Sequence, residues 1–170
     1  ILATAQGMAI CFNENDVRCM GRDAAGVRGI TLSEGDFVIG AEKMEEGKTL
    51  LTITENGYGK RTELPEYLRT GPDGEKIPQS RGGKGLKNYN ITPKTGNIAG
   101  CRVVGDNDDV MIIENGGVII RVPAASINVY KRDVQGVIVM RVDEGNKVVS
   151  IERVEAEEAQ ETQETQEKPE

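Results

Sequence analysis

The sequence predicts an all-β protein, and three observations support that prediction. Short runs of alternating apolar and polar residues, typical of half-buried strands, recur along the chain, for example at 49–54 (TLLTIT) and 147–154 (KVVSIERV). Turn pairs that contain glycine separate such runs, whereas capped segments with helical periodicity are almost absent. Similar stretches also repeat about every 50 residues, and Gly7 and Gly57, for instance, lie 50 positions apart.

The net charge of −7 is concentrated in the C-terminal tail. Residues 155–170 hold seven acidic residues and one lysine, a charge of −6, so residues 1–154 carry only −1. The tail contains no aromatic or β-branched aliphatic residue that can build a core, and we expect it to be disordered. The remaining domain is nearly neutral and is free to carry one basic face.

The composition also excludes several classes of protein. No apolar run approaches the ~20 residues of a membrane span, and no signal-peptide pattern opens the chain. The sequence has no His and only three scattered cysteines (Cys11, Cys19 and Cys101), so we expect no metal site and reduced thiols in a cytoplasmic protein. The chain starts at Ile1, within a strand-like pattern, and we expect it to be a fragment.

Three landmarks recur in the same order in each repeat. The first is a hairpin turn pair, where an Asn-Gly sequence favours two central residues with positive φ. The second is a glycine-centred stretch, here called the box, and the third is another glycine turn. The turn pairs are Gln6-Gly7, Asn56-Gly57 and Gly116-Gly117; the boxes end at Gly26, Gly85 and Gly136; the later turns lie at Gly35, Gly96 and Gly145. The middle repeat is longer, and a polar loop at 70–78 (TGPDGEKIP) accounts for its extra residues.

The repeats predict three units, at about 1–48, 49–108 and 109–154. Each unit contains about four short strands, and four-stranded units at this period are typical of blades in a propeller-like array. Three blades leave two open edges, because each blade buries its faces against its neighbours. We therefore expect either further blades before Ile1 or the association of two copies.

One box resembles a motif of a known family. Residues 79–85 (QSRGGKG) resemble the box Q-[R/K]-R-G-G-K-G in the C-terminal domain of the DNA gyrase A subunit, and the stretches at 26–40, 54–67, 118–127 and 132–154 resemble successive repeats of that domain. The resemblance implies a β-pinwheel, a propeller-like disc of about six blades that share strands with their neighbours, of which this chain supplies roughly the last three.

The sequence departs from the family pattern in two ways. Ser80 stands where the family box has a basic residue. The family box lies in the first blade, whereas this box has a blade before it. We therefore expect the first-blade box upstream of Ile1, with QSRGGKG as a well-preserved later copy.

The function that the resemblance implies is sequence-independent binding, bending and wrapping of duplex DNA. This segment would be a non-catalytic part of an ATP-hydrolysing type II DNA topoisomerase, of the isomerase class, and would support negative supercoiling. The implied partners are double-stranded DNA, the B subunit of gyrase, and a second copy of its A subunit. The segment itself needs no cofactor, whereas the holoenzyme uses ATP and Mg²⁺. The implied location is the bacterial cytoplasm, at the nucleoid, with no membrane partner.

The candidate DNA-binding residues are cations and the glycines beside them. A cation that neutralises a phosphate releases counterions, and neighbouring glycines let the backbone approach the phosphate. An arginine lies four residues before the glycine that ends each box, so one cation recurs per repeat. We predict DNA contacts from Gln79, Arg81, Gly82, Gly83, Lys84 and Gly85, from the box arginines Arg22 and Arg132, and from the hairpin cations Lys60, Arg61 and Arg121.

Other interpretations of these residues remain open. Asp23 and Asp133 directly follow two box arginines and can neutralise them, and RGGKG can be an ordinary solvated turn. A phosphate-cradling P-loop is excluded, because Pro78 and Gly85 stand where it needs Gly and Ser or Thr. The alternative functions are the equivalent domain of topoisomerase IV and a propeller-like protein-interaction module without DNA binding. No activated nucleophile or general base is recognisable, so we predict no catalytic residue.

Overall fold

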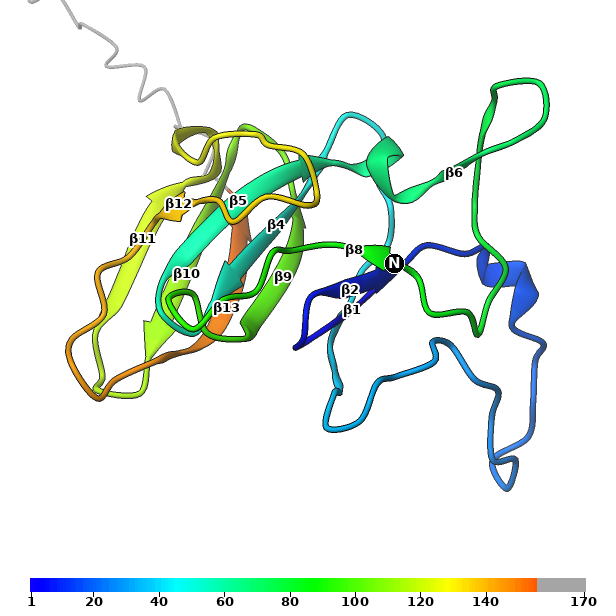
Figure 1. The fold of residues 1–170 in the computed structure, drawn as a ribbon, viewed down its shortest axis with the longest axis horizontal. Helices are drawn as coiled ribbons and strands as arrows, with labels where there is room; N and C mark the ends of the chain where they lie inside the picture. The colour runs from blue at the N-terminus through cyan, green and yellow to red at the C-terminus, as the bar shows by residue number, and fades with distance from the viewer. Residues whose placement is uncertain (156–170) are drawn as a thin grey trace, which may run out of the picture.

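The computed structural model describes residues 1–155, and Figure 1 shows short β-strands joined by long irregular segments, with 3-10 turns as the only helical elements in that part of the chain. The all-β prediction is confirmed. The acidic tail predicted to be disordered is 155–170; Glu155 is the last residue of a strand, and 156–170 lie outside the described residues. The strands are β1 (Leu2–Thr4), β2 (Met8–Ile10), β3 (Val38–Ala41), β4 (Thr49–Thr54), β5 (Tyr58–Glu63), β6 (Arg69–Thr70), β7 (Lys76–Ile77), β8 (Leu86–Lys87), β9 (Ile98–Val104), β10 (Asp108–Glu114), β11 (Ile119–Pro123), β12 (Val137–Ile138) and β13 (Val148–Glu155). Short 3-10 helices span η1 (Glu14–Asp16), η2 (Leu64–Tyr67) and η3 (Ala124–Ser126).

Three antiparallel sheets form the domain. Their strand orders are β3-β1-β2-β8, β9-β4-β5-β12 and β13-β10-β11, and each contains the hairpin of one repeat. In the middle sheet, Leu50 of β4 pairs with Thr62 of β5, and on its other side with Val103 of β9. The sheets therefore use equivalent strands of successive repeats, as the repeat pattern predicted.

In the second and third repeats, the strand that follows the box joins the hairpin of the preceding repeat. β8 follows the second box but pairs with β2 of the first hairpin, and β12 follows the third box but pairs with β5 of the second hairpin. Adjacent sheets are thus linked, because one repeat supplies strands to both of them. Two of the sheets have the four strands expected of a blade, and each takes its fourth strand from the following repeat, as the gyrase resemblance implied. The third sheet has three strands within the described residues.

The sheets have an inner and an outer edge. β3, β9 and β13 each end one sheet, and β9 contacts both of the others. These three strands therefore lie next to one another, and we call this side of the sheets the inner edge. β8 and β12 lie at the opposite ends of their sheets and form the outer edge. The second and third boxes are therefore carried to the outer edge, on the side of their sheets away from these inner contacts.

Two apolar cores separate the sheets. Because side chains alternate along a strand, β4 supplies both: Leu50 packs with Tyr67 on one side, and Leu51 and Ile53 pack with Ile112 on the other. All six residues of β4 are buried. The middle sheet is consequently covered on both faces, unlike a sheet with one solvated face.

The hairpin turns have one residue with positive φ, not two. In the middle repeat, the Gly57 amide donates a hydrogen bond to Thr54 O at 2.9 Å, and only Gly57, with φ of +78°, lies in the left-handed region. Gly7 and Gly117 repeat this arrangement. The connection is a three-residue turn that ends in a glycine bulge, so the Asn-Gly pair marked the hairpin correctly but not its turn type.

The extra segment of the middle repeat projects from the body of the domain (Figure 1). The sequence predicted a polar loop there. The structure shows a short hairpin, in which Arg69 of β6 pairs with Ile77 of β7 and Thr70 pairs with Lys76. The insertion thus reaches away from the sheets without disturbing the box that follows it.

Candidate nucleic-acid interface

Two of the three boxes dock on a neighbouring hairpin through their last glycine. Gly85 has a φ of +76°, and a Cβ built on it would lie 2.3 Å from the carbonyl oxygen of Ala9. Gly136 has a φ of +74°, and its Cβ would lie 2.4 Å from Gly59 O. Both positions therefore require glycine for conformation and for space. The first box differs, because nothing lies within 4 Å of a Cβ on Gly26.

The box at 79–85 is held by main-chain hydrogen bonds on both sides. The Gln79 amide donates to Cys11 O at 2.7 Å, and the Gln79 side chain donates to Tyr67 O at 3.1 Å. The Gly82 amide donates to Gly29 O at 2.8 Å. Since these donors are engaged within the protein, Gln79 and the Gly82 amide act in packing rather than as open phosphate contacts in this structure. Gly83 and Lys84 are exposed.

The box arginines reach main-chain carbonyl groups of neighbouring segments. Arg81 donates from Nε to Asp16 O at 3.2 Å and from Nη1 to Arg28 O. Arg132 donates from Nη1 to Lys87 O at 3.0 Å, and both arginines are half-buried. Arg22 is exposed, with no hydrogen bond or ion pair among residues 1–155. The three arginines therefore occupy equivalent sequence positions but not equivalent environments.

Two of the predicted hairpin cations are in the interior. Lys60 is fully buried, its Nζ donates to the carbonyls of Lys131 and Arg132, and it lies 5.0 Å from the centre of the Tyr89 ring. Burial lowers the pKa of Lys60 to about 7, while nearby Asp133 favours the charged form. In this structure its ammonium group has no path to a DNA phosphate, which contradicts its predicted role.

Arg61 is also buried, which corrects its predicted role as a surface contact. Its Nε donates to Ile127 O at 2.7 Å, and its guanidinium pairs with Asp106. Arg121 of β11 is exposed, but its Nε lies 2.7 Å from Asp109 Oδ2. The hairpin cations thus stabilise the fold or are neutralised by a neighbouring carboxylate.

The structure adds three cations that the sequence interpretation missed. Lys87 and Arg28 each lie two residues after the glycine that ends a box, and Lys131 lies directly before Arg132. All three are exposed. The sequence does carry a signal for Lys87 and Arg28, because a comparison of the repeats that continues two residues past the glycine of each box finds a cation in both places. We define the box cations as Arg28, Arg81, Lys84, Lys87, Lys131 and Arg132. All but Arg28 lie on β8 or in the segments that lead into β8 and β12 at the outer edge, whereas Arg28 lies outside the strands.

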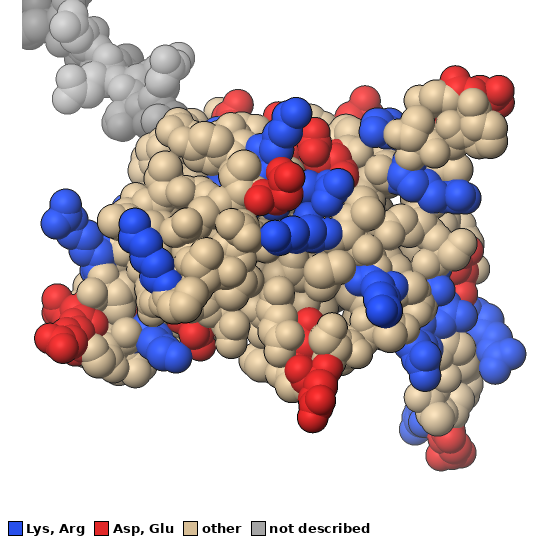
Figure 2. Space-filling view, viewed as in Figure 1, with Lys and Arg blue, Asp and Glu red and all other residues tan. Residues whose placement is uncertain are grey.

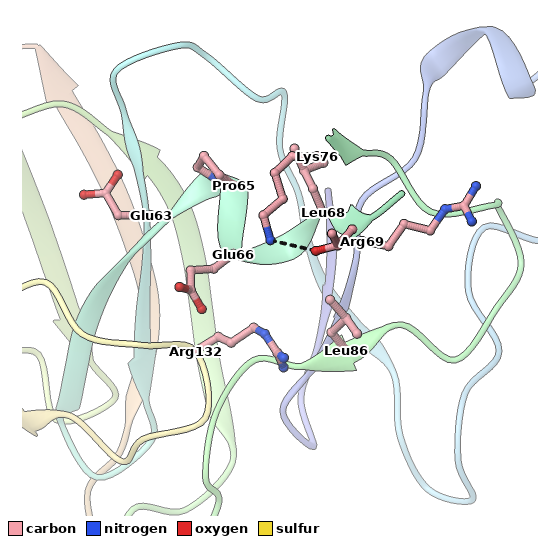
Figure 3. A pocket seen from close by; sticks show the side chains of 9 residues that line it. Glu63, Pro65, Glu66, Leu68, Arg69, Lys76, Leu86 and Arg132 are labelled. Atoms are coloured by element: carbon pink, nitrogen blue, oxygen red, sulfur yellow. Dashed lines mark hydrogen bonds between the residues drawn. The ribbon is translucent and has the colours of Figure 1, made fainter. Parts of the chain in front are cut away.

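A shallow cleft lies between η2, β8 and the third box (Figure 3). Its lining includes Arg132 and Lys76 but also Glu63 and Glu66, and the Lys76 Nζ donates to Thr70 Oγ1 at 3.2 Å. Figure 3 shows Arg132 reaching from the third box towards β8, beside Leu86. Because both signs of charge line the cleft, it is poorly suited to a free anion.

Basic and acidic side chains are interspersed on the face seen in Figure 2, with Lys and Arg in several separate groups. Among residues 1–155, no cluster of His, Cys, Asp or Glu has the arrangement of a metal site. Within the same part of the chain, no helix is long and apolar enough to cross a membrane. The local placement of cations along the boxes, rather than the overall charge, therefore distinguishes this surface.

Comparison with known proteins places this arrangement in a family. Residues 1–43, 48–105 and 108–155 each match the family model described as "DNA gyrase C-terminal domain, beta-propeller". The chain belongs to the DNA gyrase C-terminal domain family. It is 40% identical over 156 residues to the DNA gyrase A subunit of Staphylococcus epidermidis and 37% identical over 154 residues to that of Escherichia coli. These alignments cover 91% of this chain but only 16% and 17% of the relatives.

Solved structures of the gyrase family share the fold. The chain is similar to the C-terminal domain of DNA topoisomerase IV, with a TM-score of 0.80 and 27% identity over 91% of this chain and 46% of that one. It is similar to the DNA gyrase A C-terminal domain to the same degree, with a TM-score of 0.79 and 27% identity over 90% of this chain and 49% of that one. The β-pinwheel expected from the gyrase resemblance is thereby confirmed as the fold, and the chain corresponds to a fragment of such a protein.

Proposed function

We propose that this chain binds and bends duplex DNA, without reading its base sequence, as part of the A subunit of a DNA gyrase. The observation that carries the proposal is the recurrence of exposed cations at the outer edge. Lys84 and Lys87 flank the start of β8, and Lys131 stands in the third box, before β12. Repeated cations on successive sheets offer a duplex several phosphate contacts along one path, and phosphate contacts carry no sequence information.

The near-neutral charge of residues 1–154 is compatible with this proposal. DNA affinity depends on how many phosphates are neutralised locally, and each neutralised phosphate releases counterions. Bending a duplex costs several kcal/mol by elastic estimates, on the order of 1–6 kcal/mol, which contacts on more than one sheet must offset. A single box is therefore insufficient, and the proposed track requires at least the second and third boxes together.

A salt titration tests the proposal. We would measure the dissociation constant for two duplexes of unrelated sequence over a range of salt concentrations, for the wild type and for Lys84→Ala. Equal affinity for both duplexes and a steep log–log slope are expected, with the slope reduced by about 1 in Lys84→Ala. Lys43→Ala is the matched control, because Lys43 is an exposed lysine that follows β3 at the inner edge.

Two outcomes would contradict the proposal. Absence of binding even at low salt would favour the protein-interaction module, and an unchanged slope in Lys84→Ala would remove the box from the DNA path. The similar TM-scores to the gyrase and topoisomerase IV domains do not separate these two enzymes. The complete RGGKG at 81–85 favours gyrase.

The proposal extends to the whole gyrase only by family membership, since the chain spans about one sixth of the relatives' length. In that holoenzyme the proposed partners are the B subunit of gyrase, together with a second copy of the A subunit. We propose ATP and Mg²⁺ as its cofactors and the bacterial cytoplasm as its location. DNA held on the outer edge would be presented to the strand-passage gate with one handedness.

Supercoiling and relaxation assays on the holoenzyme, with and without the Lys84→Ala change, test this wider role. Loss of negative supercoiling with ATP hydrolysis retained is expected, because the variant would weaken DNA presentation without touching the catalytic machinery. Full supercoiling by the variant would contradict the role.

A further inference from the structure

We propose that Arg81 and Arg132 are positioning residues that fix the angle between each box and the segment that follows the preceding box, and thereby set the curvature of the bound DNA. This inference rests on the proposed function for its DNA consequence, but its structural part stands on the geometry of the protein alone. The phosphates would then be neutralised chiefly by the lysines around the box arginines.

The two arginines make the same contact in two places. Arg132 Nη1 donates to the carbonyl of Lys87 at 3.0 Å, and Arg81 Nη1 donates to the carbonyl of Arg28. Lys87 and Arg28 both lie two residues after the glycine that ends the preceding box. Each of these two arginines therefore donates a hydrogen bond to the same position relative to the preceding box, so the contact recurs from one repeat to the next.

This contact lies far from the strands at which the two sheets touch, so it can control the angle between the sheets. β3 and β9 of adjacent sheets touch at the inner edge, whereas β8, which carries Lys87, lies at the outer edge of the first sheet. The third box, which carries Arg132, docks on the second sheet through the pairing of β12 with β5. The bond from Arg132 to Lys87 thus joins two outer edges whose sheets meet at the inner edge, so its loss permits a change of angle between them.

The chemistry of arginine suits this role. A guanidinium group is planar and holds several donors in a fixed fork, so two carbonyl acceptors can orient it, as Asp16 and Arg28 do for Arg81. A lysine keeps the charge but offers a rotatable point donor. Lys84 and Lys131, by contrast, are exposed, and their side chains have no hydrogen bond or ion pair within residues 1–155. Their ammonium groups are accordingly the more available ones for phosphates.

Charge-conserving substitutions separate the two roles. The variants are Arg81→Lys, Arg132→Lys and the double variant, and Arg141→Lys is the matched control because Arg141 is exposed and without such contacts in the described residues. A duplex labelled at both ends reports bending by energy transfer at saturating protein. We expect the salt slope to match the wild type in all variants, and the end-to-end transfer to fall in each box variant, furthest in the double variant.

A second measurement needs no DNA. Cys19 is exposed, whereas Cys11 and Cys101 are buried, so one added cysteine, Ile138→Cys on the exposed edge of β12, gives a labelled pair that joins the first repeat to the second sheet. Spin labels at these two positions should give a narrow distance distribution in the wild type and a broader or shifted one after Arg81→Lys or Arg132→Lys. Circular dichroism confirms that each variant is folded.

These outcomes distinguish the inference from the function on which it rests. Lack of DNA binding by the wild type, together with broadened distances in the lysine variants, would refute DNA bending but support the positioning role. Unchanged distances and wild-type bending in both lysine variants would overturn the positioning role. A slope reduced by about 1 in Arg81→Ala, with wild-type bending in Arg81→Lys, would likewise identify Arg81 as a phosphate contact instead.

Discussion

The Cα of Gly85 packs directly against the carbonyl group of Ala9, which lies on β2 of the preceding repeat. A methyl group there would lie 2.3 Å from the carbonyl oxygen, and the φ of +76° is itself unfavourable for alanine. We predict that Gly85→Ala lowers the free energy of unfolding by about 3 kcal/mol or more, since backbone strain and a steric overlap add. Chemical denaturation followed by circular dichroism measures the loss.

Gly26→Ala is the matched control for that substitution. Gly26 ends the first box with a φ of +81°, but nothing lies within 4 Å of a Cβ at this position. Only the conformational cost remains, about 1–2 kcal/mol. Equal losses for Gly26→Ala and Gly85→Ala would show that the contact with Ala9 contributes nothing beyond backbone conformation.

Tyr67→Phe is predicted to lower the free energy of unfolding by about 1–3 kcal/mol. The buried Tyr67 hydroxyl donates to Asn88 Oδ1 at 2.5 Å, and Asn88 is itself buried beside Thr52. Phenylalanine would leave the amide oxygen without this donor. Tyr89→Phe is the control, since the buried Tyr89 hydroxyl has no hydrogen-bond partner among residues 1–155, and the measurement is thermal or urea unfolding of both variants. A larger loss for Tyr89→Phe would contradict the assignment.

Lys60 should make stability depend on pH near neutrality. Burial lowers its pKa to about 7, whereas an unfolded lysine titrates near ~10.4. Between these values the unfolded chain binds more protons, so the free energy of unfolding rises with pH, by about 1 kcal/mol between pH 7 and 8. Lys60→Met removes this linkage and should flatten the profile, as measured by urea unfolding at several pH values.

The Cys101 thiol sets the upper limit of the pH range in which the effect of Lys60 can be measured. Burial raises the pKa of Cys101 to about 12, so above pH ~8.5 its ionisation in the unfolded chain favours unfolding and opposes the lysine effect. Measurements below this pH isolate the lysine. The same slope in the wild type and in Lys60→Met would mean that Lys60 does not titrate in this range.

Ile138→Lys should strengthen DNA binding. Ile138 occupies on β12 the position that Lys87 occupies on β8, two residues after the box glycine, and it is 53% exposed. If the outer edge carries DNA, a cation there adds about one phosphate contact and raises the magnitude of the salt slope by about 1. Ile138→Gln controls for the loss of apolar surface. An equal slope in both variants would place the duplex elsewhere.

Sequence reasoning reached the hairpins and the boxes because both depend on local signals. Gly57 and Gly85 mark backbone positions with positive φ, and the repeat spacing predicts about four short strands in each unit. The spacing does not say which hairpin the strand after a box joins. The intervals between the glycine landmarks are the same whether that strand pairs with the hairpin of its own repeat or with that of the preceding repeat. The pairing of β8 with β2 was therefore visible only in three dimensions.

The errors at Lys60 and Arg61 have a physical cause of the same kind. The predicted DNA contacts of these two cations require a strand with one face open to solvent. β5 instead belongs to a sheet covered on both faces, where the carbonyls of Lys131 and Arg132 and the ring of Tyr89 receive the ammonium group of Lys60. Lys131 and Arg132 belong to the following repeat, and Tyr89 lies far along the chain in the same repeat, so none of them leaves a mark in the sequence around residue 60.

The exchange of box strands also dictates an order of assembly during synthesis. Ala9 pairs with Leu86, and Tyr58 pairs with Ile138, so the outer strand of each sheet leaves the ribosome many residues after the hairpin that it completes. At the usual rate of about 5–20 residues per second, the first hairpin waits several seconds with an open edge. A sheet gains its outer strand only when the following repeat has been synthesised. Folding of the domain therefore proceeds from its N-terminal side and lags about one repeat behind synthesis.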